Sequence, residues 1–192
     1  MSLTILTFGE GYNEGVARVS EITSLLAGSG SDIWFDVSQT VGEATVEKFE
    51  SARPIHRLRG FAITCEREKR APTAEEAAAG YPLLESLYDG KFATEWYTHL
   101  VDHSDDDGYY VPADFVKPLN TLVDGEVASV GSAHRLLAEM NSLEKYMLSA
   151  VNACPAEFEL EQRAWTVLRD MAKTAVEQGL VIQFRGTNPD FD

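Results

Sequence analysis

Apolar residues in the N-terminal part of the chain follow two different spacings. Leu3–Phe8 is a short β-prone run that stops at glycine, which predicts a first strand. From Val16 to Leu26 apolar residues recur every three or four positions, and this spacing predicts a helix. Ile33–Val37 is typical of a second buried strand. The strand–helix–strand order therefore predicts a βαβ-like unit with parallel strands.

Shorter elements are expected next. Glu43–Ser51 predicts a short helix that Pro54 ends, and Ile55–Thr64 predicts another strand. Two more strands are expected at Tyr109–Val111 and at Leu180–Phe184.

Helical signals dominate the rest of the chain. Thr73 and Glu76 have the spacing of a capping box, which predicts the start of a helical segment. A long helix is expected after Ser132, and another from near Pro155 to the cap at Gly179. We therefore expect an α/β or α+β protein with a short mixed sheet begun by the βαβ-like unit, several helices and a helix-rich C-terminal half.

The length of the chain sets its expected organisation. Its 192 residues suit a single globular domain, residues 1–192, with one good core. Within it, residues 71–108 are expected to form an acidic, aromatic helical insertion or subdomain. Residues 187–192 are expected to be a loose C-terminal tail.

Charge is unevenly distributed along the chain. The net charge is −15, from 16 basic and 31 acidic residues. Residues 71–116 hold ten carboxylates against one base, Lys91, so this acidic segment carries 1 − 10 = −9, and it also holds five of the seven tyrosines. Residues 53–70 have six bases and two acids, and we expect them to pair with the acidic segment. Such a field repels nucleic acid and anionic membranes.

Several function classes lack a signal in this sequence. Two cysteines are too few for a disulfide framework, and no apolar run approaches the length of a membrane helix. The N-terminus lacks a basic region ahead of its short apolar run, so we expect no signal peptide and a cytoplasmic protein. Neither a P-loop nor a nucleophile elbow is present, and we expect neither an enzyme nor a bound cofactor.

The leading hypothesis is an acidic protein-binding module whose tyrosine-rich patch recognises a basic surface. Tyrosines among carboxylates suit arginine- or lysine-rich partners. The expected partner is a basic protein or a second copy of the chain, with no nucleic acid and no membrane. In length, acidity and lack of a catalytic signature the chain resembles small bacterial immunity or inhibitor proteins, a likeness that assigns no residue roles. The patch consists of Tyr81, Tyr88, Tyr97, Asp105, Asp106, Asp107, Tyr109 and Tyr110.

A small metal-dependent hydrolase is the first alternative. His99 and His103 are four residues apart, so on one helix their rings would project from adjacent turns, with Asp102 beside the second ring. The run resembles the inverted zincin pattern H-x-x-E-H, with aspartate in place of glutamate. These three residues are therefore candidate ligands of a divalent transition metal.

A nucleotide-binding enzyme built on the βαβ unit is the second alternative. Gly9, Gly11 and Gly15 follow the first strand, and Asp36 ends the second, as in a loosened dinucleotide fingerprint. Two glutamates inside this loop, Glu10 and Glu14, would oppose a phosphate.

Overall fold

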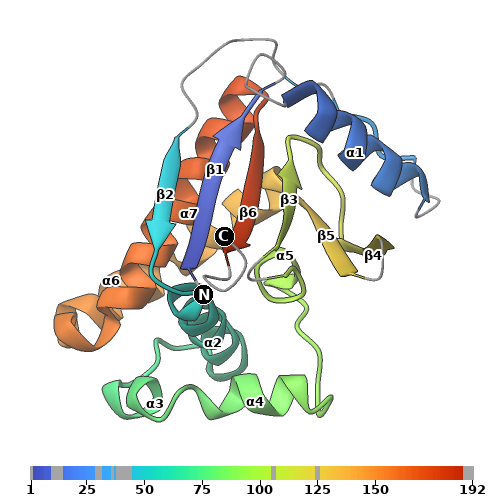
Figure 1. Cartoon of the computed structure of the whole chain (residues 1–192). Coiled ribbons are helices and arrows are strands. Elements are labelled where there is room, and N and C mark those ends of the chain that lie inside the picture. The colour runs from blue at the N-terminus through green and yellow to red at the C-terminus, as the bar shows by residue number, and fades with distance from the viewer. Residues whose placement is uncertain are drawn as a thin grey trace.

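A six-stranded mixed sheet forms the centre of the computed structural model (Figure 1). The structure describes residues 2–9, 15–28, 32–35, 37, 45–104, 107–123 and 126–187. The strands are β1 (Ser2–Phe8), β2 (Val46–Phe49), β3 (Asp107–Val111), β4 (Leu119–Val123), β5 (Glu126–Ser132) and β6 (Val181–Thr187). Their order in the sheet is β2-β1-β6-β3-β5-β4, in which β3 and β5 are parallel and the other neighbours antiparallel.

Helices surround this sheet and dominate the C-terminal half. They are α1 (Gly15–Gly28), α2 (Arg53–Glu68), α3 (Ala74–Ala78), α4 (Pro82–Tyr88), α5 (Thr98–Val101), α6 (Ala133–Ala153), the 3₁₀ helix η1 (Pro155–Phe158) and α7 (Glu159–Gln178). The expected α+β class with a mixed sheet and a helix-rich C-terminal half is confirmed. In the described residues, no helix is long and apolar enough to cross a membrane.

Two apolar clusters lie on opposite faces of the sheet. The larger joins one face to α2, α6 and α7, and the smaller joins the other face to α1. Successive strand residues point to opposite faces, so Tyr110 belongs to the larger cluster and its neighbours Tyr109 and Val111 to the smaller. In Figure 1, α3 and α4 lie below α2, at the opposite end of the molecule from α1.

The expected parallel βαβ unit is wrong. Residues 32–35 and 37, within the expected strand Ile33–Val37, are not part of a strand. Instead β1 pairs antiparallel with β2 on one side and with β6 on the other. The closing strand of the chain therefore occupies the place that a second parallel strand would take.

Three other expectations are corrected by the structure. The segment Ile55–Thr64 is helical, and buried Ile55, Leu58, Ala62 and Cys65 have the i, i+3, i+7, i+10 spacing of one helical face. Within the expected helix 43–51, residues 46–49 form strand β2. Strands β4 and β5 were not expected.

Candidate acidic binding surface

The basic residues of α2 turn toward the acidic segment but mostly contact its carbonyl groups. Arg57 Nη1 donates to Ala77 O at 3.1 Å, and its Nη2 forms an ion pair at 2.7 Å with buried Glu161 of α7, outside the acidic segment. Arg59 is 4% exposed and donates through Nε to Leu100 O at 2.9 Å and through Nη2 to His103 O. A carbonyl oxygen satisfies a guanidinium N–H without removing a negative charge from the surface.

Two further bases at the end of α2 lie over aromatic rings. The Arg67 guanidinium is 4.6 Å from the centroid of Phe92. The Lys69 ammonium is 3.4 Å from the centroid of Trp96. These cation–π contacts also leave the carboxylates of the acidic segment without a counter-charge.

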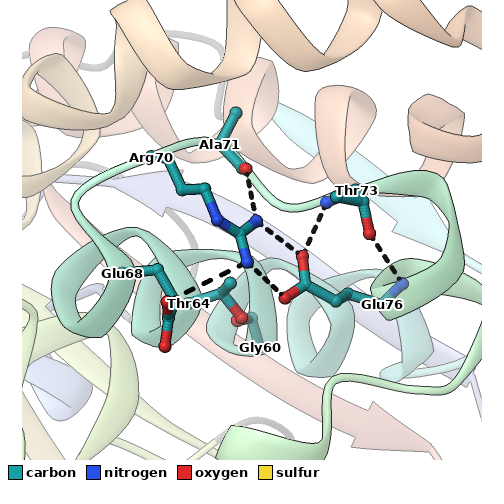
Figure 2. Close-up of polar contacts among 7 residues, drawn as sticks. All are labelled: Gly60, Thr64, Glu68, Arg70, Ala71, Thr73 and Glu76. Atoms are coloured by element: carbon teal, nitrogen blue, oxygen red, sulfur yellow. Dashed lines mark hydrogen bonds and ion pairs between the residues drawn. The ribbon is translucent and has the colours of Figure 1, made fainter.

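Arg70, two residues after the end of α2, forms an ion pair with Glu76 of the acidic segment (Figure 2). Its two terminal nitrogens donate to both oxygens of Glu76 at 2.8 and 2.7 Å, and one also donates to Ala71 O at 3.0 Å. The Thr73 amide donates to Glu76 at 2.7 Å, and the Glu76 amide donates to Thr73 Oγ1, which confirms the capping box. The hydrogen bond from Arg70 lowers the pKa of Glu76 to about 2.

Several exposed carboxylates of the acidic segment are therefore left without a base. Asp89 pairs with Lys91 and Asp114 with Arg135. Asp107 is exposed at the start of β3, and Asp105 and Asp106 lie outside the described residues. Within the part of the chain that the structure describes, no ion pair involves the remaining four. We name these four the acidic surface: Glu75 on α3, Glu85 on α4, Glu95, and Asp102 after α5.

The structure corrects the expectation that the tyrosines of the acidic segment form a surface patch. Tyr81, Tyr97, Tyr109 and Tyr110 are at most 3% exposed, and of the five tyrosines Tyr88 alone is exposed, at 51%.

Internal partners explain this burial. The Tyr81 hydroxyl donates to Glu161, and the Tyr110 hydroxyl donates to His99 O at 2.7 Å. Burial is tolerated because each hydroxyl finds an acceptor inside the protein.

The expected metal site is not formed. His99 Nδ1 accepts from the Ser132 amide at 3.0 Å, and its Nε2 lies 3.0 Å from Phe115 O. His103 also points into the core, whereas Asp102 is exposed. Among the described residues, no group of three histidine, cysteine, aspartate or glutamate side chains could hold a metal ion.

Burial in the core disfavours the protonated, positively charged form of both histidine rings. His103 has its ring nitrogens 2.8 Å from Ser104 O and 3.0 Å from Tyr109 O, and it stacks on Tyr110 at 4.0 Å. Burial lowers the pKa of His99 and that of His103 to about 4.

The nucleotide hypothesis loses its structural basis. It depended on a parallel βαβ unit, and β1 has antiparallel neighbours. Gly9 follows β1 and Gly15 begins α1, while Gly11 and Asp36 lie outside the described residues.

Two buried carboxylates hold the middle of the acidic segment in place. Glu66 of α2 accepts from the Thr94 hydroxyl at 2.6 Å and from the Glu95 amide at 2.9 Å. Glu139 of α6 accepts from the amides of His99 at 2.9 Å and Leu100 at 2.8 Å. Burial raises the pKa of Glu139 to about 8, against the opposing effect of these two amides.

Trp96 lies between these two supports, in residues 92–97, which are not helical. The Trp96 side chain is 54% exposed, whereas Leu100 is 1% exposed. An exposed tryptophan beside unpaired carboxylates belongs to the same candidate surface.

The fold and this surface define the class of protein as an acidic α+β binding module. Residues 5–184 match the model of a family described as "Putative DNA-mimic protein", and the chain belongs to this family. No curated protein and no solved structure matches the chain.

Family membership confirms the coarser expectation of an acidic protein-binding module. It also corrects the expected partners, which were a basic protein or a homo-oligomer with nucleic acid set aside. The family description concerns mimicry of DNA, so nucleic-acid recognition cannot be set aside as it was in the expected partners.

Proposed function

We propose that this protein occupies the DNA-binding surface of a DNA-binding protein and presents carboxylates where DNA presents phosphates. The observation that carries the proposal is the set of four exposed, unpaired carboxylates of the acidic surface. They lack ion pairs to described residues because the neighbouring bases are directed to carbonyl oxygens, to aromatic rings and, for Arg57, to Glu161 of α7. The family description supports the same interpretation.

Physical chemistry favours such a display of charge. DNA attracts proteins largely through phosphate charges that are neutralised by lysine and arginine. A protein with net charge −15 that leaves carboxylates unpaired offers a comparable field to the same cationic surface. The hydrogen bonds that Glu66 and Glu139 accept from backbone amides fix the chain around Glu95, which reduces the entropy lost on binding.

Competition with DNA tests the proposal. Immobilised protein is exposed to a cell extract and then washed with a short duplex DNA, and each protein that the duplex elutes is purified. The purified protein is bound to a fluorescent duplex, and the acidic protein is titrated in. We expect it to displace the duplex while showing no binding to the duplex alone. If the bound proteins resist elution by DNA, or if the fluorescent duplex stays bound, the proposed function is wrong.

A matched pair of variants separates the acidic surface from net charge. The first variant neutralises that surface with Glu75→Gln, Glu85→Gln, Glu95→Gln and Asp102→Asn. The control neutralises four exposed carboxylates elsewhere with Glu50→Gln, Glu157→Gln, Glu159→Gln and Asp170→Asn. Both variants change the net charge by the same amount. We expect the first to weaken displacement about 10-fold or more, through slower association, and the control to weaken it far less.

A further inference from the structure

Trp96 has the surroundings of a binding residue rather than of a stray surface aromatic. Two hollows flank it, one of about 360 Å³ and one of about 200 Å³, and both are lined by Trp96 and Glu95. Large exposed aromatics beside a hollow are the residues on which protein interfaces most often depend.

The backbone around Trp96 is held on both sides by buried groups. Glu66 accepts from the amide of Glu95 and, at 3.4 Å, from that of Trp96. Glu139 accepts from the amides of His99 and Leu100. These contacts come from α2 and from α6, so the exposed ring is attached to a segment fixed by two helices. A ring that is already in position loses little conformational entropy when a partner covers it.

The larger hollow has the chemistry of a site for a planar cation. Glu95 lines it at the surface together with Trp96, Thr98 and Ser142, and the buried Glu139, whose oxygens accept hydrogen bonds from the amides of His99 and Leu100, also contributes to its lining. Its lining contains one base, Arg135, and that guanidinium is bound in two places to Asp114. Lys69, which already lies over the Trp96 ring, lines the smaller hollow instead.

We propose that the larger hollow receives an arginine side chain of the partner, stacked on Trp96 and paired with Glu95. This inference rests on the proposed function, because arginine is the side chain with which DNA-binding proteins contact phosphates and base edges. A guanidinium combines a flat face for an aromatic ring with N–H groups for carboxylate and hydroxyl oxygens. A lysine ammonium would satisfy the charge but not the stacking.

A small probe tests the site without a partner. The protein is labelled with ¹⁵N and titrated with N-acetyl-arginine methylamide, with the matching lysine and citrulline compounds as controls. The indole N–H signals report separately on Trp34, Trp96 and Trp165 once each is assigned from a Trp→Phe variant. Trp34 is 79% exposed and lines neither hollow, and Trp165 donates to Met140 O in the core. Both are therefore internal controls.

We expect the Trp96 signal to shift in a saturable way with arginine, with a Kd on the order of 1 mM. Glu95→Gln should weaken this Kd several-fold, and the neutral citrulline compound should leave the signal unmoved. Equal shifts of Trp34 and Trp96, or equal affinity for arginine and citrulline, would overturn the proposed site.

The partner then distinguishes this inference from the proposed function. Trp96→Leu is expected to reduce displacement of DNA from the partner at least 10-fold, and Trp34→Leu is expected to leave displacement unchanged. If Trp96→Leu competes with DNA as well as the wild type does, the arginine site is wrong while the DNA-mimic function stands. If neither the wild type nor Trp96→Leu competes with DNA, the proposed function itself fails, whatever the titration with the arginine compound shows.

Discussion

The acidic segment, residues 71–116, and the C-terminal helical region, residues 133–178, differ in how much of their negative charge is offset by bases of their own. The helical region has five bases and seven acids, a net charge of 5 − 7 = −2, against −9 in the acidic segment. In the helical region Glu144 pairs with Arg169 and Glu177 with Lys173, while exposed Glu157, Glu159 and Asp170 have no ion pair to a described residue. In the acidic segment, bases supplied by α2 contact carbonyls and rings, and exposed carboxylates stay unpaired.

The difference shows that composition alone does not set the electrostatic surface. Residues 53–70 contain six bases, enough to reduce the charge of the acidic segment considerably. Their positions on α2 send Arg59 into the core and Lys69 onto an aromatic ring. The acidic segment also uses carboxylates differently, because Glu66 and Glu139 support it from beneath with hydrogen bonds to its amides.

The largest expected effect comes from removing one of these buried supports. Glu66→Ala leaves the amide of Glu95 and the hydroxyl of Thr94 without their acceptor, and we expect a loss of about 3 kcal/mol in the free energy of unfolding. Glu144→Ala removes a surface partner of Arg169 and should lose less than about 1 kcal/mol. Urea denaturation of both variants measures the difference. Equal losses would show that the buried carboxylate is not a support.

The second effect concerns pH and has opposite signs for two kinds of buried group. His99 and His103 have pKa values lowered from 6.5 to about 4, so the stability they contribute is complete above pH 6.5 and declines as pH falls toward 4. The pKa of Glu139 is raised from 4.5 to about 8, so its contribution is complete below pH 4.5 and declines as pH rises through 8. Stability should therefore peak near pH 6.5.

Denaturation at a series of pH values tests this profile. We expect a decline of roughly 2 kcal/mol on the alkaline side and roughly 4 kcal/mol on the acid side, where two histidines titrate. The groups near Glu139 that carry charge are Asp102 and Glu66, whose negative charges act in the same direction as burial. Glu139→Gln removes the titrating group and should flatten the alkaline side while steepening the acid side, where Glu139 no longer offsets the two histidines. An alkaline decline that persists in this variant would assign it to another group.

Much of the fold could be predicted from the pattern of apolar residues. The short β-prone runs of β1 and β6 were sufficient to predict those strands. The helical spacing of α6 and α7 was sufficient to predict those helices. Ile55–Thr64 was misread as a strand because its length and β-branched residues resemble one, whereas buried positions recur at helical spacing from Ile55 to Cys65. The pairing of β1 with β6 joins the two ends of the chain, and no local pattern carries that information.

The candidate surface was predicted as a region but not in its residues. The density of carboxylates located the acidic segment, and the family supports a role in binding. The sequence could not show that Tyr81 would meet Glu161, which lies 80 positions further along the chain. Nor could it show that Trp96 is exposed, since that depends on where Glu66 and Glu139 hold the backbone.

A smaller effect is expected from the ion pair between Arg70, which follows α2, and Glu76 of the acidic segment. Arg70→Gln removes a two-point contact with Glu76 and a bond to Ala71 O at a partly exposed site, so we expect a loss of up to about 1 kcal/mol. Arg169→Gln removes one hydrogen bond to Glu144 and a cation–π contact with Trp165 at 5.0 Å, against three hydrogen bonds lost with Arg70, and should lose less. Thermal denaturation of both proteins measures the order, and a larger loss for Arg169→Gln would contradict it.

The smallest expected effect is a gain, rather than a loss, in the free energy of unfolding. Asp102 carries no ion pair to a described residue, and burial raises the pKa of its carboxyl, so the fold disfavours its charge. We expect Asp102→Asn, combined with Glu95→Gln, to raise the free energy of unfolding by a few tenths of a kcal/mol at low salt, because repulsion within the acidic segment is relieved.

The matched change in the helical region should act the other way. Glu144→Gln combined with Glu177→Gln removes the contacts with Arg169 and Lys173, so this pair should lose a few tenths of a kcal/mol. Salt screens exposed charges, and both differences should shrink as salt is added to the urea titrations. A gain of stability in the acidic segment together with weaker competition for a DNA-binding partner would mean that its charge is kept for binding rather than for folding. A loss of stability in both regions would show that these carboxylates are neutralised within the protein after all, which would remove the physical basis for the proposed mimicry.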